Sequence, residues 1–211
     1  MDLAVRLVPV LMATILSLLT FQTHGANSQT ITSEELDRVF SAIKQNNWRV
    51  AEKEAALLIQ RDSQAQKYLI ARLRYIYLFS IAVQLEKKEV KYSDLKKKLS
   101  LVARQLVIQP WHPVKTNANP CFNLICADKD NPSVLVTAQA NGNATQVYSF
   151  EYFDMGAPIN VSSYNGQNAR LGGLLEKIEI NENLEKAEKT GSEVTWFFRL
   201  SVRDAFIDYE R

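Results

Sequence analysis

The residues able to act as acid, base or nucleophile are few in this 211-residue chain. Of its two histidines, His24 lies in an N-terminal segment that we expect to be removed, which leaves His112 as the only imidazole. A serine or cysteine triad needs a histidine base and would have to use this residue. His112 stands between Trp111 and Pro113 in an expected connection, and we interpret it as structural. The sequence contains no glycine-rich phosphate loop, HExxH motif or nucleophile elbow.

Carboxylates offer a second route to chemistry, since a glycoside hydrolase can work with two acidic side chains alone. Glu151 and Asp154 are the first candidates, and each is expected at the surface. Asp128, Asp130 and Asn131 bring side-chain oxygens together, but a calcium loop needs more ligands and a glycine hinge, so we expect a β-turn there. We therefore predict no catalytic residue, no metal site and no cofactor, and a protein that is not an enzyme.

Cys121 and Cys126 are the only cysteines, five residues apart. In an oxidising compartment such a pair predicts a disulfide, which requires residues 122–125 to bend. Closing so short a loop contributes about 2 kcal/mol to stability through the entropy of the unfolded chain. The alternative is two buried thiols. A metal site is less favoured, because the cysteines and His112 fall short of the four ligands of a structural zinc.

The N-terminus carries an apolar run over residues 7–21, LVPVLMATILSLLTF, followed by small and polar residues. The length of this run suits the core of a secretory signal and falls short of the roughly twenty residues that span a bilayer as a helix. We therefore predict a signal peptide over residues 1–26 and export to a periplasmic or extracellular compartment. The alternative is an uncleaved membrane anchor.

Glycine and proline divide the remaining chain into two parts. Neither occurs between Asn27 and Gln109, whereas eleven occur from Pro110 onward. A long segment without these residues favours helix, and a segment rich in them favours strands joined by turns. We predict an α+β protein with a helical module over residues 27–110 and a β-rich module over residues 111–211.

Apolar side chains at helical spacing predict four helices in the first module, with Ser33 as the expected cap of the first. The third is apolar around nearly its whole circumference towards its end, so we expect it to be buried between neighbours. If its Arg72 and Arg74 are buried, they need partners, for which a carboxylate from another helix, such as Glu35 or Glu52, is the simple answer. The four helices are expected over about residues 33–45, 48–59, 64–86 and 93–107.

The segment NNWRVAEKEAALLIQRD, residues 46–62, resembles the second helix of a tetratricopeptide repeat. In that family an aromatic residue precedes a small one by three positions, as Trp48 precedes Ala51, and a unit closes near a proline, as the second helix pair does at Pro110. The resemblance implies helical hairpins whose concave face binds a peptide or protein segment, with no contact residue assigned. A generic packing of four helices is the alternative.

The second module follows a period of two. Asn141-Gly142 lies between two alternating segments and predicts a β-hairpin with a two-residue turn that sets Val136 opposite Val147. A second turn is expected at Asn165-Gly166. Further on we expect a strand to about Ile180, an acidic turn or helix ended by Gly191, and a last strand with one apolar face. The prediction is five or six antiparallel strands in a small sandwich or curved sheet that docks against the helices.

Charge is distributed unevenly between the modules. Residues 31–110 hold fifteen Lys and Arg against nine Asp and Glu, net +6, and residues 111–211 hold nine against thirteen, net −4. Halves of opposite sign attract each other or present different faces to different partners. Neither value is high enough to argue for nucleic acid, so no such partner is expected.

A basic cluster in the helical module is a candidate site for an anionic ligand, such as a polysaccharide or an anionic lipid. A solvated face is the plainer interpretation. Membrane contact is expected only through the signal peptide or through this cluster. The cluster comprises Lys87, Lys88, Lys91, Lys96, Lys97 and Lys98.

These features together predict an exported, non-enzymatic binding or accessory protein. We expect its repeat-like helical module to bind another exported or envelope protein. The alternative function is a polysaccharide-binding or anionic-lipid-binding protein of the envelope or extracellular space. The partner site is expected before Pro110 or in a groove between the two modules.

Overall fold

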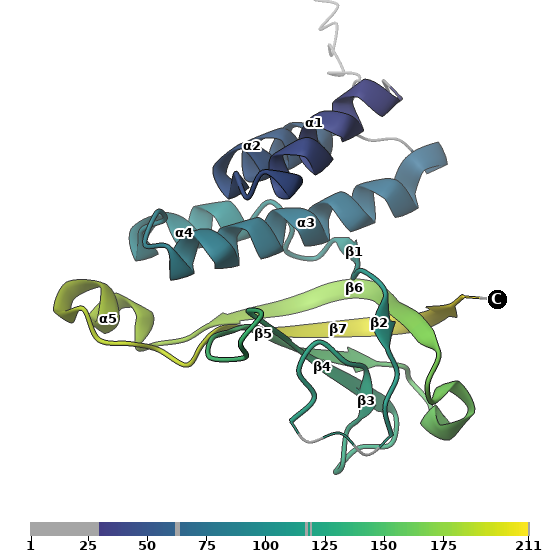
Figure 1. Ribbon diagram of the computed structural model, residues 1–211. Coiled ribbons are helices and arrows are strands. Elements are labelled where there is room, and N and C mark those ends of the chain that lie inside the picture. Colours follow the sequence, from purple (N-terminus) through teal and green to yellow (C-terminus); the bar gives the residue numbers. More distant parts are fainter. Residues whose placement is uncertain (1–29, 62–63, 117, 119, 211) are drawn as a thin grey trace, which may run out of the picture.

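A computed structural model describes residues 30–61, 64–116, 118 and 120–210, and the expected signal peptide lies outside these residues. Its N-terminal helices form one layer that covers one face of a sheet (Figure 1). This arrangement confirms the α+β class. The helices are α1 Ser33–Lys44, α2 Trp48–Leu58, α3 Lys67–Glu86, α4 Tyr92–Leu99 and α5 Leu184–Thr190, with 3-10 turns η1 Gln64–Gln66 and η2 Val161–Tyr164.

The β half forms one mixed sheet of seven strands in the order β1-β6-β7-β5-β4-β3, with β2 also paired to β6. Strands β5 and β7 run parallel, while the other pairs are antiparallel. We expected five or six wholly antiparallel strands in a sandwich or a curved sheet; the parallel pair contradicts the wholly antiparallel arrangement, and the sandwich is not confirmed. The strands are β1 Leu106–Ile108, β2 His112–Pro113, β3 Cys126–Ala127, β4 Val134–Ala140, β5 Val147–Asp154, β6 Asn168–Ile180 and β7 Trp196–Tyr209.

Side-chain caps start the first two helices. Thr32, instead of the expected Ser33, caps α1: its hydroxyl accepts a hydrogen bond from Glu35 N at 3.3 Å, and the Glu35 carboxylate accepts one from Thr32 N at 2.9 Å. Asn47 caps α2, where its side chain accepts a hydrogen bond from Val50 N at 3.3 Å. Each cap satisfies backbone N–H groups that have no partner inside the helix.

The central helix of the upper layer is α3, which lies between α2 and the sheet. Phe79 contacts both neighbours, with ring centroids 5.5 Å from Trp48 and 5.2 Å from Tyr148. The segment Gln64–Glu86 is apolar and long enough to cross a membrane, yet 61% of its most apolar window is buried inside the protein. This burial is as predicted for a helix packed between neighbours.

The fourth helix is shorter than predicted, because α4 ends at Leu99. The backbone of Arg104 has a φ of 60°, which a helix cannot contain, and its N–H donates to Leu175 O of β6 at 2.9 Å. Leu106 and Val107, expected on the inner face of this helix, instead lie in β1 and pair with β6. The first strand therefore begins before Pro110, the predicted boundary between the modules.

The predicted hairpin exists, but its turn and register differ from the prediction. In the β4–β5 pair Val147 lies opposite Ala140, and Val136 lies opposite Tyr152. The loop is longer than two residues, because the Asn141 side chain accepts a hydrogen bond from Thr145 N at 3.0 Å. Asn-Gly occurs both in tight two-residue turns and in wider loops that the asparagine side chain organises, so the sequence pattern does not distinguish them.

The second Asn-Gly pair does not join two strands. The residues before it form the 3-10 turn η2, and Gly166 has a φ of 84° at the approach to β6. Gly191 behaves as predicted: its φ is 74°, a left-handed conformation that suits glycine, and it ends α5. The strand, acidic helix and terminating glycine expected in this region are thus confirmed.

The two edges of the sheet meet at one end through the segment that precedes β3. Ile125 N donates to Pro113 O at 3.0 Å, and Lys115 N donates to Ile125 O at 2.9 Å. The disulfide Cys121–Cys126 lies in the same segment, as predicted, and residues 122–125 bend to allow it. The sheet consequently curls around a concave interior that faces the helices.

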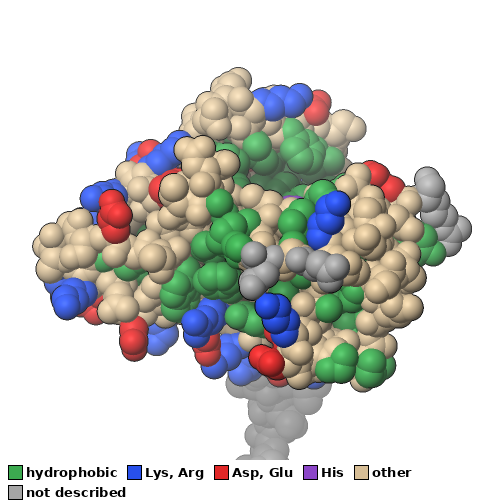
Figure 2. Space-filling view, turned by 60° about the horizontal axis from the view of Figure 1, so that its bottom comes forward, with side chains coloured by type: hydrophobic (Ala, Val, Ile, Leu, Met, Phe, Trp, Pro, Cys, Tyr) green, Lys and Arg blue, Asp and Glu red, His purple; other side chains and the backbone are tan. Residues whose placement is uncertain are grey.

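The face of the sheet turned away from the helices is partly open. Because side chains alternate along a strand and Glu151 points to α3, Phe150 and Tyr152 lie on this opposite face. Tyr152 is 38% exposed. Figure 2 shows hydrophobic side chains gathered near the centre of this underside, with Lys and Arg side chains beside them.

The core is continuous between the helices and the sheet. Leu73 and Ile81 of α3 are fully buried in the same hydrophobic cluster as Phe153, Phe198 and Leu200 of the sheet. The neighbouring surfaces of the two modules are thus apolar. Such packing fixes the position of α3 above β5 and β7.

Candidate functional site

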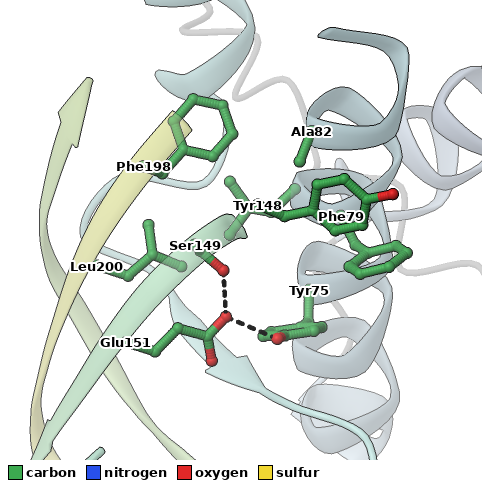
Figure 3. A pocket seen from close by; sticks show the side chains of 9 residues that line it. Tyr75, Phe79, Ala82, Tyr148, Ser149, Glu151, Phe198 and Leu200 are labelled. Carbon is green, nitrogen blue, oxygen red and sulfur yellow. Dashed lines mark hydrogen bonds between the residues drawn. The ribbon is translucent and has the colours of Figure 1, made fainter. Parts of the chain in front are cut away.

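Glu151 is the most deeply buried carboxyl group of the described residues, with 1% of its surface exposed. Figure 3 shows it beside the helix that carries Tyr75, α3: its Oε1 accepts hydrogen bonds from Tyr75 OH and Ser149 Oγ, both at 2.7 Å. Gln109, with its amide oriented to satisfy both neighbours, donates from Nε2 to Glu151 Oε2 at 3.3 Å and accepts from Leu171 N at 3.2 Å. All three donors to the carboxyl group are neutral.

Burial among neutral donors raises the pKa of Glu151 to about 7, although the hydrogen bonds from Tyr75 and Ser149 partly offset this rise. Burial also raises the pKa of the Tyr75 hydroxyl well above its ordinary value, and the neighbouring Glu151 adds to that effect. Tyr75 is therefore a permanent donor. The prediction that Glu151 lies at the surface is wrong.

The cavity beside Glu151 has a volume of only about 10 Å³. That is near the smallest space that holds one water molecule. Its walls are mainly the apolar side chains of α3 and the sheet (Figure 3), which include Leu78, Phe79 and Phe198. The site has the carboxyl and hydroxyl groups of an acid–base pair, but this cavity has no room for a substrate.

His112 belongs to a separate buried group. Its Nε2 lies 2.9 Å from Gln139 Nε2, and the Gln139 amide also contacts Thr137 Oγ1 at 3.4 Å. Burial lowers the pKa of His112, while a hydrogen bond with the backbone of Asn123 opposes this shift. The ring is therefore neutral at pH 7, with Nε2 accepting from Gln139. No hydrogen bond between described residues joins His112 to Glu151.

The remaining oxygen-rich candidates are turns. Asp128 Oδ1 accepts hydrogen bonds from Asp130 N at 2.8 Å and Asn131 N at 2.9 Å, which confirms the expected turn. Asp154 is exposed and accepts from Gly156 N at 2.9 Å. Within the described ranges, no group of three His, Cys, Asp or Glu side chains is placed to hold a metal ion.

Arg72 of α3 is exposed and Arg74 is half-buried, and among the described residues neither pairs with Glu35 or Glu52. Glu35 forms an ion pair with Arg61, and Glu52 forms one with Lys98. Arg74 instead donates to Leu106 O of β1 at 3.1 Å. These ion pairs connect Glu35 of α1 with Arg61, which follows α2, and Glu52 of α2 with Lys98 of α4.

The lysine cluster is divided between different environments. Lys98 is half-buried in its ion pair with Glu52, and Lys88 lines a groove between the two modules. Lys87 Nζ lies 3.5 Å from Asn46 O. Lys91, Lys96 and Lys97 are exposed.

A groove of about 500 Å³ lies where the end of α3 and the turn to α4 face α5 and the β4–β5 loop. This volume is within the range of ligand sites in proteins. The two modules contribute jointly to its walls. The lining residues are Leu85, Glu86, Lys88, Val90, Tyr92, Thr145, Gln146, Leu184, Ala187, Glu188, Gly191, Ser192, Glu193, Val194 and Phe197.

The floor of this groove is apolar and its rim is acidic. Phe197 and Leu184 are buried, while Val194 is half-buried. Glu86 is fixed at the rim, because its carboxylate accepts hydrogen bonds from Tyr148 OH at 2.8 Å and from the Asn141 side chain at 2.9 Å. An apolar floor beneath oriented polar groups is the common form of a binding site.

Three comparisons, with known protein families, with curated proteins and with solved structures, found no match for the chain. The fold and the groove therefore carry the functional argument alone. From the sequence we expected the partner site either before Pro110 or in a groove between the modules, and no groove residue was named. Its walls come from residues 85–92, 145–146 and 184–197, and only the folded sheet brings these segments together.

Proposed function

We propose that the mature chain is an exported, non-enzymatic binding protein that holds part of a partner protein in the groove between its two modules. The observation that carries this proposal is the groove of about 500 Å³ with its apolar floor and acidic rim. The buried Glu151 and His112 serve the core in this proposal, because each is satisfied by neutral neighbours.

Export is supported by the apolar run at residues 7–21 and by the Cys121–Cys126 disulfide, which suits an oxidising compartment. We place the partner in the same periplasmic or extracellular compartment. The repeat-like helical module would contribute the end of α3 and the turn to α4, while the β module supplies the facing wall.

Site-specific photo-crosslinking in the producing cells tests this proposal. A crosslinking residue at Thr145, which is exposed at the groove, is compared with one at Leu57, which is 55% exposed on α2. We expect a protein adduct from position 145 that is absent from position 57. Adducts from position 57 with none from position 145 would move the site to the outer helical surface.

A second candidate function is binding of a polysaccharide or anionic lipid by the lysine cluster. It is favoured by Lys91, Lys96 and Lys97, which are exposed and form no salt bridge among the described residues. Replacing these three lysines with glutamine should then abolish binding to anionic vesicles or glycans. Binding that survives the triple replacement would rule out this use of the cluster.

A further inference from the structure

We infer that the groove takes an extended peptide segment in which basic side chains alternate with apolar ones, and that the segment pairs with the backbone just ahead of β7. This inference rests on the proposed function and specifies the part of the partner that the groove receives. It follows from three features of the groove: backbone groups that form no hydrogen bond among the described residues, an apolar floor, and carboxylates that form no salt bridge among those residues.

Among the residues that the structure describes, no strand lies beside the backbone leading into β7. On one side β5 begins at Val147, opposite Trp196, and on the other side β6 ends at Ile180, opposite Phe198. Within the part of the chain that the structure describes, no hydrogen bond uses the backbone N–H or C=O of residues 193 and 194. Free backbone groups beside a sheet are the feature that an added peptide strand recognises.

The same segment borders the apolar floor. Val194 is half-buried, and Phe197, three residues further on, is 3% exposed. Val90 and Tyr92 face them from the turn before α4 and from its first residue. In a bound strand every second side chain points the same way, so one set would face this floor and the other the rim.

The rim carries more negative than positive charge. Glu86, Glu188 and Glu193 line the groove against one lysine, Lys88. Glu188 accepts a hydrogen bond from Tyr92 N at 2.9 Å, and none of the three carboxylates forms a salt bridge with a described residue. Such a rim is complementary to lysine or arginine side chains of a ligand.

A small cationic amphiphile matches the floor and the rim, but it leaves the backbone of residues 193 and 194 unused. A peptide uses all three features at once, because its main chain supplies the missing donors and acceptors. The structure thus favours a peptide over a small amphiphile.

Titration calorimetry of the mature protein, from residue 27, tests the inference with three capped octapeptides. One alternates Lys and Val, one Glu and Val, and one Lys and Ser. We expect the Lys–Val peptide to bind at least tenfold more tightly than either of the others. Equal binding of the Lys–Ser peptide would show simple charge attraction and overturn the inference.

Matched variants locate the binding. Glu188→Gln and Glu193→Gln should each weaken the Lys–Val peptide about two- to fivefold, whereas Glu182→Gln, an equal charge change outside the groove, should not. Val194→Pro removes one backbone donor without changing charge and should weaken binding about fivefold. Wild-type affinity in a folded Val194→Pro variant, together with competition by dodecyltrimethylammonium, would indicate an amphiphile site instead.

The outcomes for the ligand and for the groove are distinguishable. If no peptide binds while the crosslink from Thr145 persists, the inference on the ligand is wrong and the proposed function stands. If the crosslink is absent and the peptides do not bind, the proposed function itself is contradicted.

Discussion

At the scale of single residues, Glu151 is a carboxyl group that the fold holds away from water among three neutral donors. Ionising such a group costs free energy, because no cationic side chain of the described residues forms a salt bridge with it. We expected it at the surface, but the face of β5 that carries Glu151 turns inward, where Tyr75 and Gln109 satisfy it. That inversion depends on residues far away in the chain.

The first prediction concerns pH and Glu151→Gln. The pKa of Glu151 rises from 4.5 when unfolded to about 7 when folded, so its contribution to stability is complete below pH 4.5 and is lost as pH rises through 7. Above pH 8 the ionised group costs about 3 kcal/mol relative to its protonated form. Glutamine removes this cost and keeps an acceptor for Tyr75.

Urea denaturation of wild type and Glu151→Gln at several pH values between 4.5 and 8.5 tests this pH dependence. The free energy of unfolding of Glu151→Gln, minus that of the wild type, should increase between pH 4.5 and about 7 and then level off. The subtraction cancels other carboxylates, such as Glu35, whose pKa the Arg61 hydrogen bond lowers to about 2. A difference that stays constant with pH would show that Glu151 does not titrate in this range.

The second prediction concerns the donor Tyr75. Tyr75→Phe removes the hydroxyl that bonds Glu151 and should destabilise the protein by about 1–3 kcal/mol at pH 8, where the carboxylate is charged, and by less at pH 5. Tyr68→Phe is the matched control, since Tyr68 is 52% exposed and should tolerate the change. Equal effects of the two changes would argue against the Tyr75–Glu151 bond.

At the scale of elements, local patterns predicted α1, α2, α3, α5 and the last strand, because their apolar periodicity and end signals are short-range. They missed β1 and the hairpin register. Leu106 and Val107 fit a helix pattern equally well, and only pairing with β6 makes them a strand. The pairing of β4 and β5 includes a wide loop organised by the Asn141 side chain and a register shift between Gln139 and Ala140, and the pattern of strand residues encodes neither.

The third prediction concerns the close approach of β6 and β7. A Cβ on Gly173 would lie 2.7 Å from Val202 Cγ1 and 2.8 Å from Arg203 O, so Gly173→Ala must displace backbone. We expect a loss of about 1–3 kcal/mol in the free energy of unfolding. Gly142→Ala has nothing within 4 Å of the new Cβ and serves as the control. Full stability of Gly173→Ala would contradict the packing of these strands.

The fourth prediction concerns the disulfide beside the closure of the sheet. Replacing Cys121 and Cys126 with serine should lower the free energy of unfolding by about 2 kcal/mol, because the unfolded chain regains the entropy of the short loop. Thermal denaturation of wild type and variant, each with and without reductant, measures this loss. We expect reductant to destabilise the wild type and to leave the stability of the variant unchanged. Two free thiols in exported wild-type protein would disprove the bond.

At the scale of the whole molecule, the opposite charges of the modules do not produce a simple basic face against an acidic face. The helical half is basic overall, yet the groove that it shares with the β half has an acidic rim. The net charge of each module can be counted from the sequence, and a groove between the modules was one of the two expected places for the partner site. The positions of the groove carboxylates could not be predicted, because they depend on where α5 lies relative to the end of α3.

The fifth prediction belongs to this scale and tests the central claim, that the groove holds the partner. Hydrogen–deuterium exchange is measured on the mature protein alone and in complex with the protein captured by crosslinking. We predict new protection at the amides of residues 192–194 and 88–90, with the underside of the sheet unchanged. Protection confined to α1 and α2 or to the underside, with the groove amides exchanging as before, would contradict it.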